Sequence, residues 1–318
     1  MKNTILLPDL IDLHLHLDGS LPPTTARKLA QMQGIPIPDT LEEIKRKMSI
    51  KPNCKDLNDY LSRFRLSCSL LRTGEALTIG MQDLLEELHR QGLVYTEIRF
   101  APQKSCAEGF SQYDAALAAL EAIKTSPIPC GLILSMMRDG SPEANNETVE
   151  VAKALHGKGV VAVDLAGAEA LYPTSLFREQ FAAVRAAGIP LIVHAGEAAG
   201  AESVREAVKA GARRIGHGVR SLEDPEVVQM LVSEQVTLEL CPTSNLNTGL
   251  FPDYAHYPLR ELMDAGVRVC VNTDNMTVSA TTLKKEWQHL IDNLHLTQAE
   301  VNHIAQDTIQ ATFRADGK

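Results

Sequence analysis

The stretch Leu10-Ile11-Asp12-Leu13-His14-Leu15-His16 places two histidines at alternate positions of an apolar run near the start of the chain. Side chains alternate between the two faces of a strand, so both imidazoles are expected on one side. Residues 189–197, 214–218 and 267–274 repeat the arrangement, because each strand-like stretch ends in a histidine or an acid. Parallel strands that deliver such residues from their carboxyl ends are typical of the mouth of a (β/α)8 barrel.

Strand-like and helix-like stretches alternate along the whole chain. Val, Ile and Leu dominate the strand-like stretches, as expected for strands buried on both faces, and amphipathic segments separate them. We therefore predict the α/β class, with a (β/α)8 TIM barrel that forms a single domain over residues 1–318. The predicted strands are residues 9–17, 93–100, 131–138, 160–165, 189–195, a short one around Ile215, 236–240 and 267–273. The predicted helices include residues 112–124, 145–156, 175–187, 201–211, 256–265 and a final helix that a capping box opens at Thr297.

A long insertion interrupts this rhythm between the first two predicted strands, which lie more than seventy residues apart. Within it, Leu57, Tyr60, Leu61 and Phe64 fall at i, i+3, i+4 and i+7, which is one face of a helix. This face either packs on the barrel or closes over an apolar ligand, and one helix can do both. Long insertions after a barrel strand lie on the catalytic face, so we predict a helical lid after strand 1.

Composition limits the classes of partner. The formal net charge is −9, whereas a phosphate backbone requires clustered Lys and Arg, so no nucleic-acid partner is expected. No apolar stretch approaches the ~20 residues of a membrane helix, and no signal peptide is evident. The six cysteines avoid CxxC spacing. We expect a cytoplasmic protein that acts on a small molecule without a membrane partner. The oligomeric state stays open.

Five side chains at strand ends suit metal chemistry: His14, His16, His194, His217 and Asp274. Each has an ordinary alternative, such as a buried hydrogen-bonded histidine or, for Asp274, a helix N-cap. Together, on one face of a barrel, they predict a site for a divalent ion, and zinc suits this donor set best. His217 could ligate the metal or act as a base on its water.

Two acids lie beside these residues. Glu197, three residues after His194, suits proton transfer, and its alternative is a solvent-exposed loop carboxylate. Asp18 follows the first strand, where a carboxylate can meet a substrate hydroxyl or can serve a turn.

Five motifs in this order resemble the adenosine deaminase family of the amidohydrolase superfamily. They are Asp12-Leu13-His14-Leu15-His16-Leu17-Asp18-Gly19, Val163-Asp164-Leu165-Ala166-Gly167, His194-Ala195-Gly196-Glu197, Gly216-His217-Gly218 and Asn272-Thr273-Asp274. They cover essentially the whole chain. The resemblance implies zinc-dependent hydrolysis of adenosine, and of 2′-deoxyadenosine, to inosine and ammonia in purine salvage.

The resemblance also implies roles for individual residues. One Zn²⁺ per chain is expected on His14, His16, His194 and Asp274. Glu197 resembles the donor of a proton to purine N1, while His217, with Asp274, resembles the residue that orients or deprotonates the attacking water. The expected substrate contacts are His16, Asp18 at the ribose, Gly167 at the purine, Asn275, and the apolar lid residues Leu57, Tyr60, Leu61 and Phe64.

The chain departs from the family pattern at two places. Asn275 stands where a second aspartate often hydrogen-bonds purine N7, and Ala168, followed by Glu169, stands where an acid often occurs. An amide can donate to N7, so purine binding is retained and the exact purine stays open. Adenine, an adenosine nucleotide or a 5′-modified adenosine therefore remain alternative substrates, although Asp18 would repel a 5′-phosphate.

Two further alternatives change the chemistry. One is a catalytically inactive nucleoside-binding homologue, which a missing ligand would have suggested. The other is an amide or lactone hydrolase with two metals, which often carries a lysine after strand four. Asp164-Leu165-Ala166-Gly167 stands at that place and favours one metal.

Overall fold

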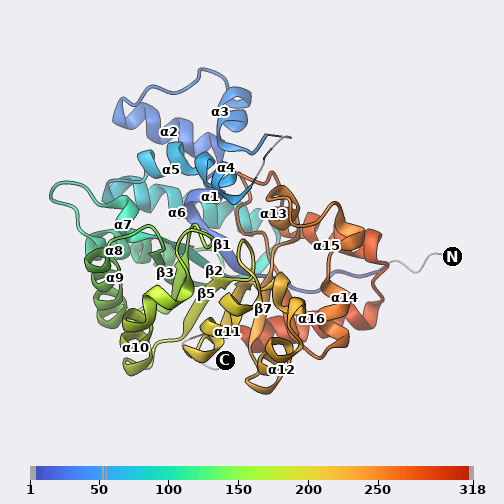
Figure 1. Cartoon of the computed structure of the whole chain (residues 1–318). Coiled ribbons are helices and arrows are strands. Elements are labelled where there is room, and N and C mark those ends of the chain that lie inside the picture. The colour runs from blue at the N-terminus through green and yellow to red at the C-terminus, as the bar shows by residue number, and fades with distance from the viewer. Residues whose placement is uncertain (1–4, 52–53, 55, 315–318) are drawn as a thin grey trace.

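Eight parallel strands form one sheet in sequence order, β1-β2-β3-β4-β5-β6-β7-β8, in the computed structural model (Figure 1). The structure describes residues 5–51, 54 and 56–314. The predicted α/β barrel is confirmed, and every predicted strand lies within two residues of an observed one. The strands are β1 Leu10–His16, β2 Leu93–Phe100, β3 Cys130–Met137, β4 Val160–Ala166, β5 Leu191–Ala195, β6 Arg214–His217, β7 Thr237–Leu240 and β8 Arg268–Val271.

The barrel closes between β1 and the residues that follow β8. The His16 amide donates to the Asp274 carbonyl and the Asp274 amide donates to the His14 carbonyl, each at 2.8 Å. Beneath this bridge, the Thr273 hydroxyl donates to a buried Asp12 carboxylate oxygen at 2.6 Å. Three of the predicted metal ligands therefore form the seam of the barrel, which fixes their backbones relative to one another.

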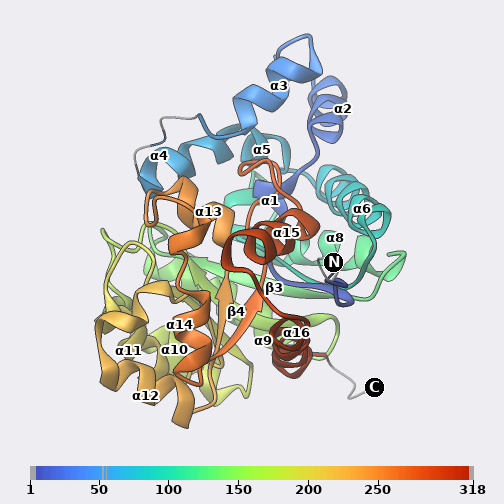
Figure 2. The ribbon, with the colours of Figure 1, turned by 90° about the vertical axis from the view of Figure 1, so that its right-hand side faces the viewer.

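Helices surround the sheet and bury its outer face (Figures 1 and 2). Capping boxes at Ser111 and Thr297 start two of them, the second as predicted. The predicted helix over 175–187 is a 3-10 turn, η2 Thr174–Phe177, followed by α10. The outer helices are α8 Gln112–Lys124, α9 Pro142–Leu155, α10 Arg178–Ala186, α11 Ala201–Lys209, α12 Pro225–Ser233, α14 Leu259–Asp264, α15 Leu283–Leu294 and α16 Gln298–Ala311.

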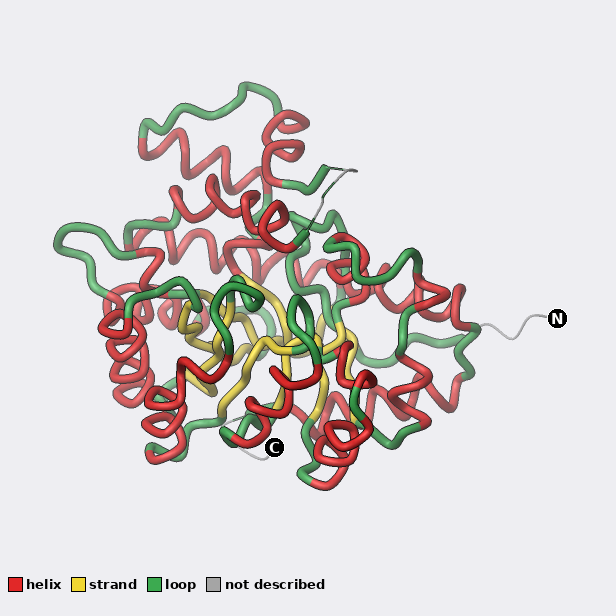
Figure 3. The backbone as a smooth tube through the Cα atoms, viewed as in Figure 1, coloured by secondary structure: helices red, strands yellow, loops and turns green. Residues whose placement is uncertain are grey.

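The insertion after β1 stands as a group of helices above the carboxyl ends of the strands (Figures 1 and 3). It contains α1 Leu17–Ser20, α2 Pro23–Gln33, α3 Leu41–Met48, α4 Leu57–Leu61, the 3-10 turn η1 Ser62–Phe64 and α5 Arg65–Leu70. The long helix α6 Gly74–Gln91 packs beside α8 and takes the place of the barrel helix before β2. The predicted helix at 57–64 is thus one short α-helix and a 3-10 turn.

The inside of the barrel is polar and charged, in contrast to the apolar layer between the sheet and its helices. Asp12, Glu97, Arg99, Asp164 and Glu239 are all fully buried strand residues. Buried charges are stable only when they are paired, so this interior must contain ion pairs. None of the helices in the described ranges has the length and apolar character that crossing a membrane requires.

Candidate active site

The mouth of the barrel brings together four predicted metal ligands, and one ligand atom from each lies within 4.8 Å of the others: His14, His16, His194 and Asp274. His16 Nε2 lies 3.2 Å from His194 Nε2. Asp274 Oδ1 lies 3.4 Å from both His14 Nε2 and His16 Nε2. Ligands bound about 2.0–2.1 Å from a tetrahedral zinc are about 3.3–3.4 Å apart. The spacing therefore suits a single divalent ion.

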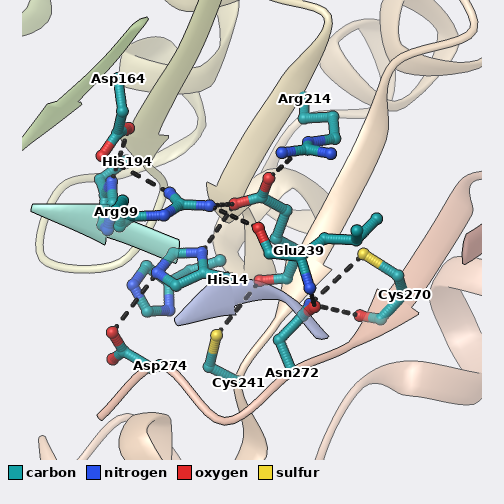
Figure 4. Close-up of polar contacts among 12 residues, drawn as sticks. His14, Arg99, Asp164, His194, Arg214, Glu239, Cys241, Cys270, Asn272 and Asp274 are labelled. Carbon is teal, nitrogen blue, oxygen red and sulfur yellow. Dashed lines mark hydrogen bonds and ion pairs between the residues drawn. The ribbon is translucent and has the colours of Figure 1, made fainter. Parts of the chain in front are cut away.

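Carboxylates fix two of these imidazoles so that their Nε2 atoms face the site (Figure 4). His14 Nδ1 donates to Glu239 Oε2 at 2.7 Å, and His194 Nδ1 donates to Asp164 Oδ1 at 3.0 Å. A carboxylate accepts only, so each Nδ1 carries the hydrogen and each Nε2 keeps a free lone pair. His14 Nε2 is buried and has no hydrogen-bond partner among the described residues. A metal ion would supply that missing partner.

The backbone at two predicted site residues lies in the left-handed region. His217 has a φ of 64° and Asp274 a φ of 59°, which is unusual for residues with a Cβ. Such strain concentrates at active sites, where the surrounding structure imposes it. A Cβ at Gly216 would lie 2.9 Å from His14 and 3.1 Å from His194, so only glycine lets these rings approach β6.

Asp274 has a partner for its second oxygen. The Ser244 hydroxyl, in α13 Pro242–Asn247, donates to Asp274 Oδ2 at 2.6 Å. The alternative of a helix N-cap is not observed, because Thr282 caps the next helix. Burial by itself raises the pKa of Asp274, but the close approach of the imidazoles, His14 first among them, outweighs it and lowers the pKa below its usual range. Asp274 is therefore ionised, as a metal ligand must be.

His217 is held as a neutral hydrogen-bond donor. Tyr257 donates to Asn245 Oδ1 at 2.9 Å, which leaves Asn245 Nδ2 to donate to His217 Nδ1 at 3.1 Å. Burial keeps the pKa of His217 well below its usual range, so the hydrogen of the neutral ring is on Nε2, 3.6 Å from Glu197. His217 also lies near Cys241, but burial raises the pKa of that thiol and disfavours the thiolate that binds metals.

Glu197 is a buried carboxyl rather than an exposed loop residue. Burial, with the nearby charges of Asp274 and Glu169, raises its pKa well above the usual range, so it holds a proton. Glu169 accepts from the backbone N–H groups of Gly196, Glu197 and Ala199 at 2.8, 3.1 and 2.9 Å. Oxygen Oε1 of Glu197 has no hydrogen-bond partner in the described part of the chain. The loop thus presents an uncommitted acid to the site.

A cavity of about 470 Å³ connects these groups, which is large enough for a nucleoside. Its apolar wall comes from α4 and η1, where Tyr60 is fixed by a 2.7 Å hydrogen bond to Ser279. Every predicted substrate contact lines it, with Glu197, His194, His217 and Asp274: His16, Asp18, Leu57, Tyr60, Leu61, Phe64, Gly167 and Asn275. Closure of this wall over a ligand stays a prediction.

Asn275 packs against α1, the short helix that follows β1. A Cβ on Gly19 would lie 1.7 Å from Asn275 Oδ1, so glycine is required for this close approach. Asn275 is buried, and its Oδ1 has no hydrogen-bond partner within the described ranges. Asn275 also lines the cavity, where its Nδ2 can donate to a ligand. Nearby, Asp18 accepts a hydrogen bond from Cys68 at 3.5 Å.

Several residues that hold the site were missed as functional from the sequence. Ser244 and Asn245 gave no signal, because they approach Asp274 and His217 only after folding. Glu169 was noticed as a departure from a pattern, without a role. Asp164 and Glu239 did give a signal, since an acid inside a buried strand must have a partner.

A barrel mouth that gathers three imidazoles, a carboxylate and a buried acid of raised pKa around one cavity has the donor set of a metal-dependent hydrolase. The sequence model described as adenosine deaminase matches residues 9–318. The chain belongs to the adenosine deaminase family, which confirms the resemblance found in its motifs.

Individual relatives agree with this assignment. An adenosine deaminase of Haemophilus ducreyi is 44% identical, with 95% of this chain and 91% of that protein aligned. One from Enterococcus faecalis is 38% identical over the same shares. Among solved structures, an adenine deaminase from Arthrobacter aurescens superposes with a TM-score of 0.88 at 29% identity, covering 97% of this chain and 95% of that one.

Proposed function

We propose that this protein, acting as a single domain with one zinc ion, hydrolyses adenosine to inosine and 2′-deoxyadenosine to 2′-deoxyinosine, with release of ammonia. The observation that carries the proposal is the position of Glu197, a buried acid whose pKa is raised by burial, on the same cavity as the three imidazoles and Asp274. A site that only bound a metal would not require a protonated carboxyl beside it.

The ligand set that we propose for zinc is His14, His16, His194 and Asp274. When bound, the ion would lower the pKa of water to about 7 and so supply hydroxide at neutral pH. The fit rests on the 3.2–3.4 Å spacing of the donor atoms and on the unpartnered His14 Nε2.

The protein side chains would then move protons around the purine ring. As oxygen adds to C6, Glu197 donates its proton to N1 and the carboxyl becomes a carboxylate. The Nε2–H group of His217 donates a hydrogen bond to the attacking oxygen, because His217 Nδ1 already accepts one from Asn245. This hydrogen bond favours an orienting role for His217 over a role as base. The proton of the C6 hydroxyl then passes to the amino group, which leaves as ammonia. The proton that water lost when it became hydroxide returns to the Glu197 carboxylate and regenerates the acid.

Other residues of the cavity would position the nucleoside. We assign Asp18 to the ribose, the backbone of Gly167 and the Asn275 amide to the purine, and the wall of Leu57, Tyr60, Leu61 and Phe64 to exclusion of water. Exclusion of water strengthens each of these hydrogen bonds.

The proposal includes a cytoplasmic location and a small-molecule partner, with no role for nucleic acid or membrane. All six cysteines are free thiols, which suits a reducing compartment. The net charge of −9 disfavours binding to a phosphate backbone.

The second candidate substrate is adenine, because one structural relative is an adenine deaminase. Ammonia release should be measured with adenosine, 2′-deoxyadenosine, adenine and adenosine 5′-monophosphate. We expect the highest kcat/KM for adenosine, with a large loss for the nucleotide, because Asp18 repels phosphate. A higher kcat/KM for adenine than for adenosine would overturn the proposed substrate. No ammonia from any of the four would indicate an inactive nucleoside-binding homologue.

A further inference from the structure

A connected set of buried ion pairs occupies the inside of the barrel beneath the metal-binding candidates (Figure 4). Arg99 lies at its centre. Its Nη2 donates to Glu239 Oε2 at 2.8 Å and to the Leu13 carbonyl at 2.7 Å, while Nη1 lies 3.5 Å from Asp164 Oδ2. Glu239 and Asp164 are the carboxylates that orient His14 and His194. One guanidinium therefore joins the partners of two candidate ligands.

Arg214 extends this set toward the opposite end of the barrel. It is the first residue of β6, whereas His217 is the last, so the two lie at opposite ends of this strand. Arg214 Nε lies 2.6 Å from Glu239 Oε1, the oxygen that His14 does not use. Arg214 Nη2 donates to Glu97 Oε2 at 2.6 Å. Arg214 thus ties Glu239 to a second buried carboxylate.

The end of the described chain holds Arg214 in place. Arg214 Nη1 donates to the carbonyl of Ala311, the last residue of α16, at 2.9 Å. The Phe313 ring lies 4.0 Å from the guanidinium, and the Phe313 amide donates to Glu97 Oε1 at 2.7 Å. A carbonyl, an aromatic face and a carboxylate therefore enclose this cation. Through Arg214 and Glu239, a chain of contacts connects this C-terminal segment to His14.

We propose that Arg214, seated by Ala311 and Phe313, is a positioning residue for the metal ligand His14, so that metal affinity depends on the C-terminal segment. Without Arg214, Arg99 is the one arginine or lysine among the described residues that still pairs with Glu239, and Glu239 Oε1 loses its counter-charge in a site with no exposed surface. The carboxylate would then shift, and the His14 ring with it. The inference rests on the metal site of the proposed function.

The test compares zinc affinity of four purified full-length variants with that of the wild type, by competition with a chelator. Arg214→Met removes the cation, Arg214→Lys retains it without the planar fork, and Phe313→Ala removes the aromatic face. Arg260→Met is the matched control, because Arg260 also binds near α16, through Glu300 and the Leu294 carbonyl, but lies outside the barrel. Visible spectra of the cobalt(II) forms report ligand geometry, and thermal unfolding of the metal-free forms reports folding.

We expect Arg214→Met to weaken zinc binding by about 10-fold, the lower end of the range for direct partners of metal ligands, because Arg214 acts through Glu239, and to change the cobalt spectrum. Arg214→Lys should recover part of the affinity, and Arg260→Met should match the wild type. If Arg214→Met does not fold, Phe313→Ala decides, with a severalfold loss expected.

If a folded Arg214→Met variant has the zinc affinity and cobalt spectrum of the wild type, the role of Arg214 is overturned and the proposed metal site is not. If Arg214→Met does not fold, the same result in Phe313→Ala overturns it. An equal loss of zinc affinity in Arg260→Met would also overturn the role of Arg214, because the loss would then come from general destabilisation of the packing of α16. A wild-type protein that binds no zinc would overturn the proposed metal site itself.

Discussion

The rim of the barrel and the wall formed by α4 and η1 face the same cavity but are built in opposite ways. On the rim, the side chains of His14, His194 and Asp274 come from the ends of strands or from the barrel seam. A hydrogen bond fixes the atom of each that is not proposed to bind the metal. On the wall, Leu61 and Phe64 come from a short helix and a 3-10 turn and are only partly buried. The rim is polar and its side chains are hydrogen-bonded, whereas the wall is apolar and, apart from Tyr60, partly exposed.

This difference assigns separate tasks to the two regions. Chemistry requires atoms held within a fraction of an ångström, which strand ends and paired carboxylates provide. Binding of an apolar base requires buried area, which a short helical segment can provide without exact placement. Substitutions on the rim should therefore change metal content and kcat, and substitutions on the wall should change mainly KM.

The largest effect is expected for the rim ligands. His16→Ala or Asp274→Ala should lose zinc and activity together, because each removes a donor from a set of four. Zinc content by atomic absorption, measured beside turnover of adenosine, checks this. Stoichiometric zinc with a near-normal rate would remove that residue from the ligand set.

Glu197→Gln separates proton transfer from metal binding on the same rim. Gln can hydrogen-bond N1 but cannot donate a proton to it, so we expect zinc to be retained and kcat to fall by about 10²–10⁴-fold. A loss of less than about threefold would contradict the role, on the same scale.

The pH profile gives an independent check on Glu197. Only the protonated form donates, so kcat/KM should fall as pH rises through its pKa. Because burial raises that pKa, the fall should lie well above the ordinary carboxyl range. Glu197→Gln should lack this alkaline limb. Persistence of the limb in the variant would assign it to another group.

Asn275 lies where the two regions meet, and a smaller effect is expected there. If its amide donates to N7, 7-deazaadenosine should bind more weakly by about 1–3 kcal/mol, the cost of an unpaired buried donor. Asn275→Asp should lose activity more steeply than the wild type as pH rises, because the ionised carboxylate repels the N7 lone pair.

Measurement of kcat/KM for both nucleosides with both proteins, from mildly acidic to mildly basic pH, tests this role. Unchanged profiles and unchanged discrimination against the deaza compound would leave Asn275 with a purely structural role in the turn after β8.

The smallest effect is expected on the wall. Leu61→Ala should raise KM about tenfold with kcat nearly unchanged, because it removes about 1.4 kcal/mol of apolar contact with the ligand. Leu176→Ala, an exposed leucine of η2, is the matched control and should match the wild type. A fall in kcat without a change in KM for Leu61→Ala would erase the distinction between wall and rim.

The sequence predicted the residues of the rim better than it predicted the residues that hold them in place. A period of two in β1 and the polar ends of β5, β6 and β8 were sufficient to predict which side chains meet, because parallel strands end at one edge. The partners were not predictable in the same way. His14 and Glu239 are 225 positions apart, and nothing local in the sequence pairs them.

The wall was predicted in part. The spacing of Leu57, Tyr60, Leu61 and Phe64 identified the apolar face, and all four line the cavity. The spacing did not predict the change to a 3-10 turn at Ser62, because both kinds of helix bring i and i+3 side chains close together.

Hydrolysis of adenosine should require one metal ion on the rim. The most direct test removes metal with a chelator and returns zinc stepwise while ammonia release from adenosine is measured. We expect activity to be lost and then to rise linearly to its full value at one zinc per chain. A metal-free protein that keeps the full rate, or a requirement for two ions per chain, would contradict the account.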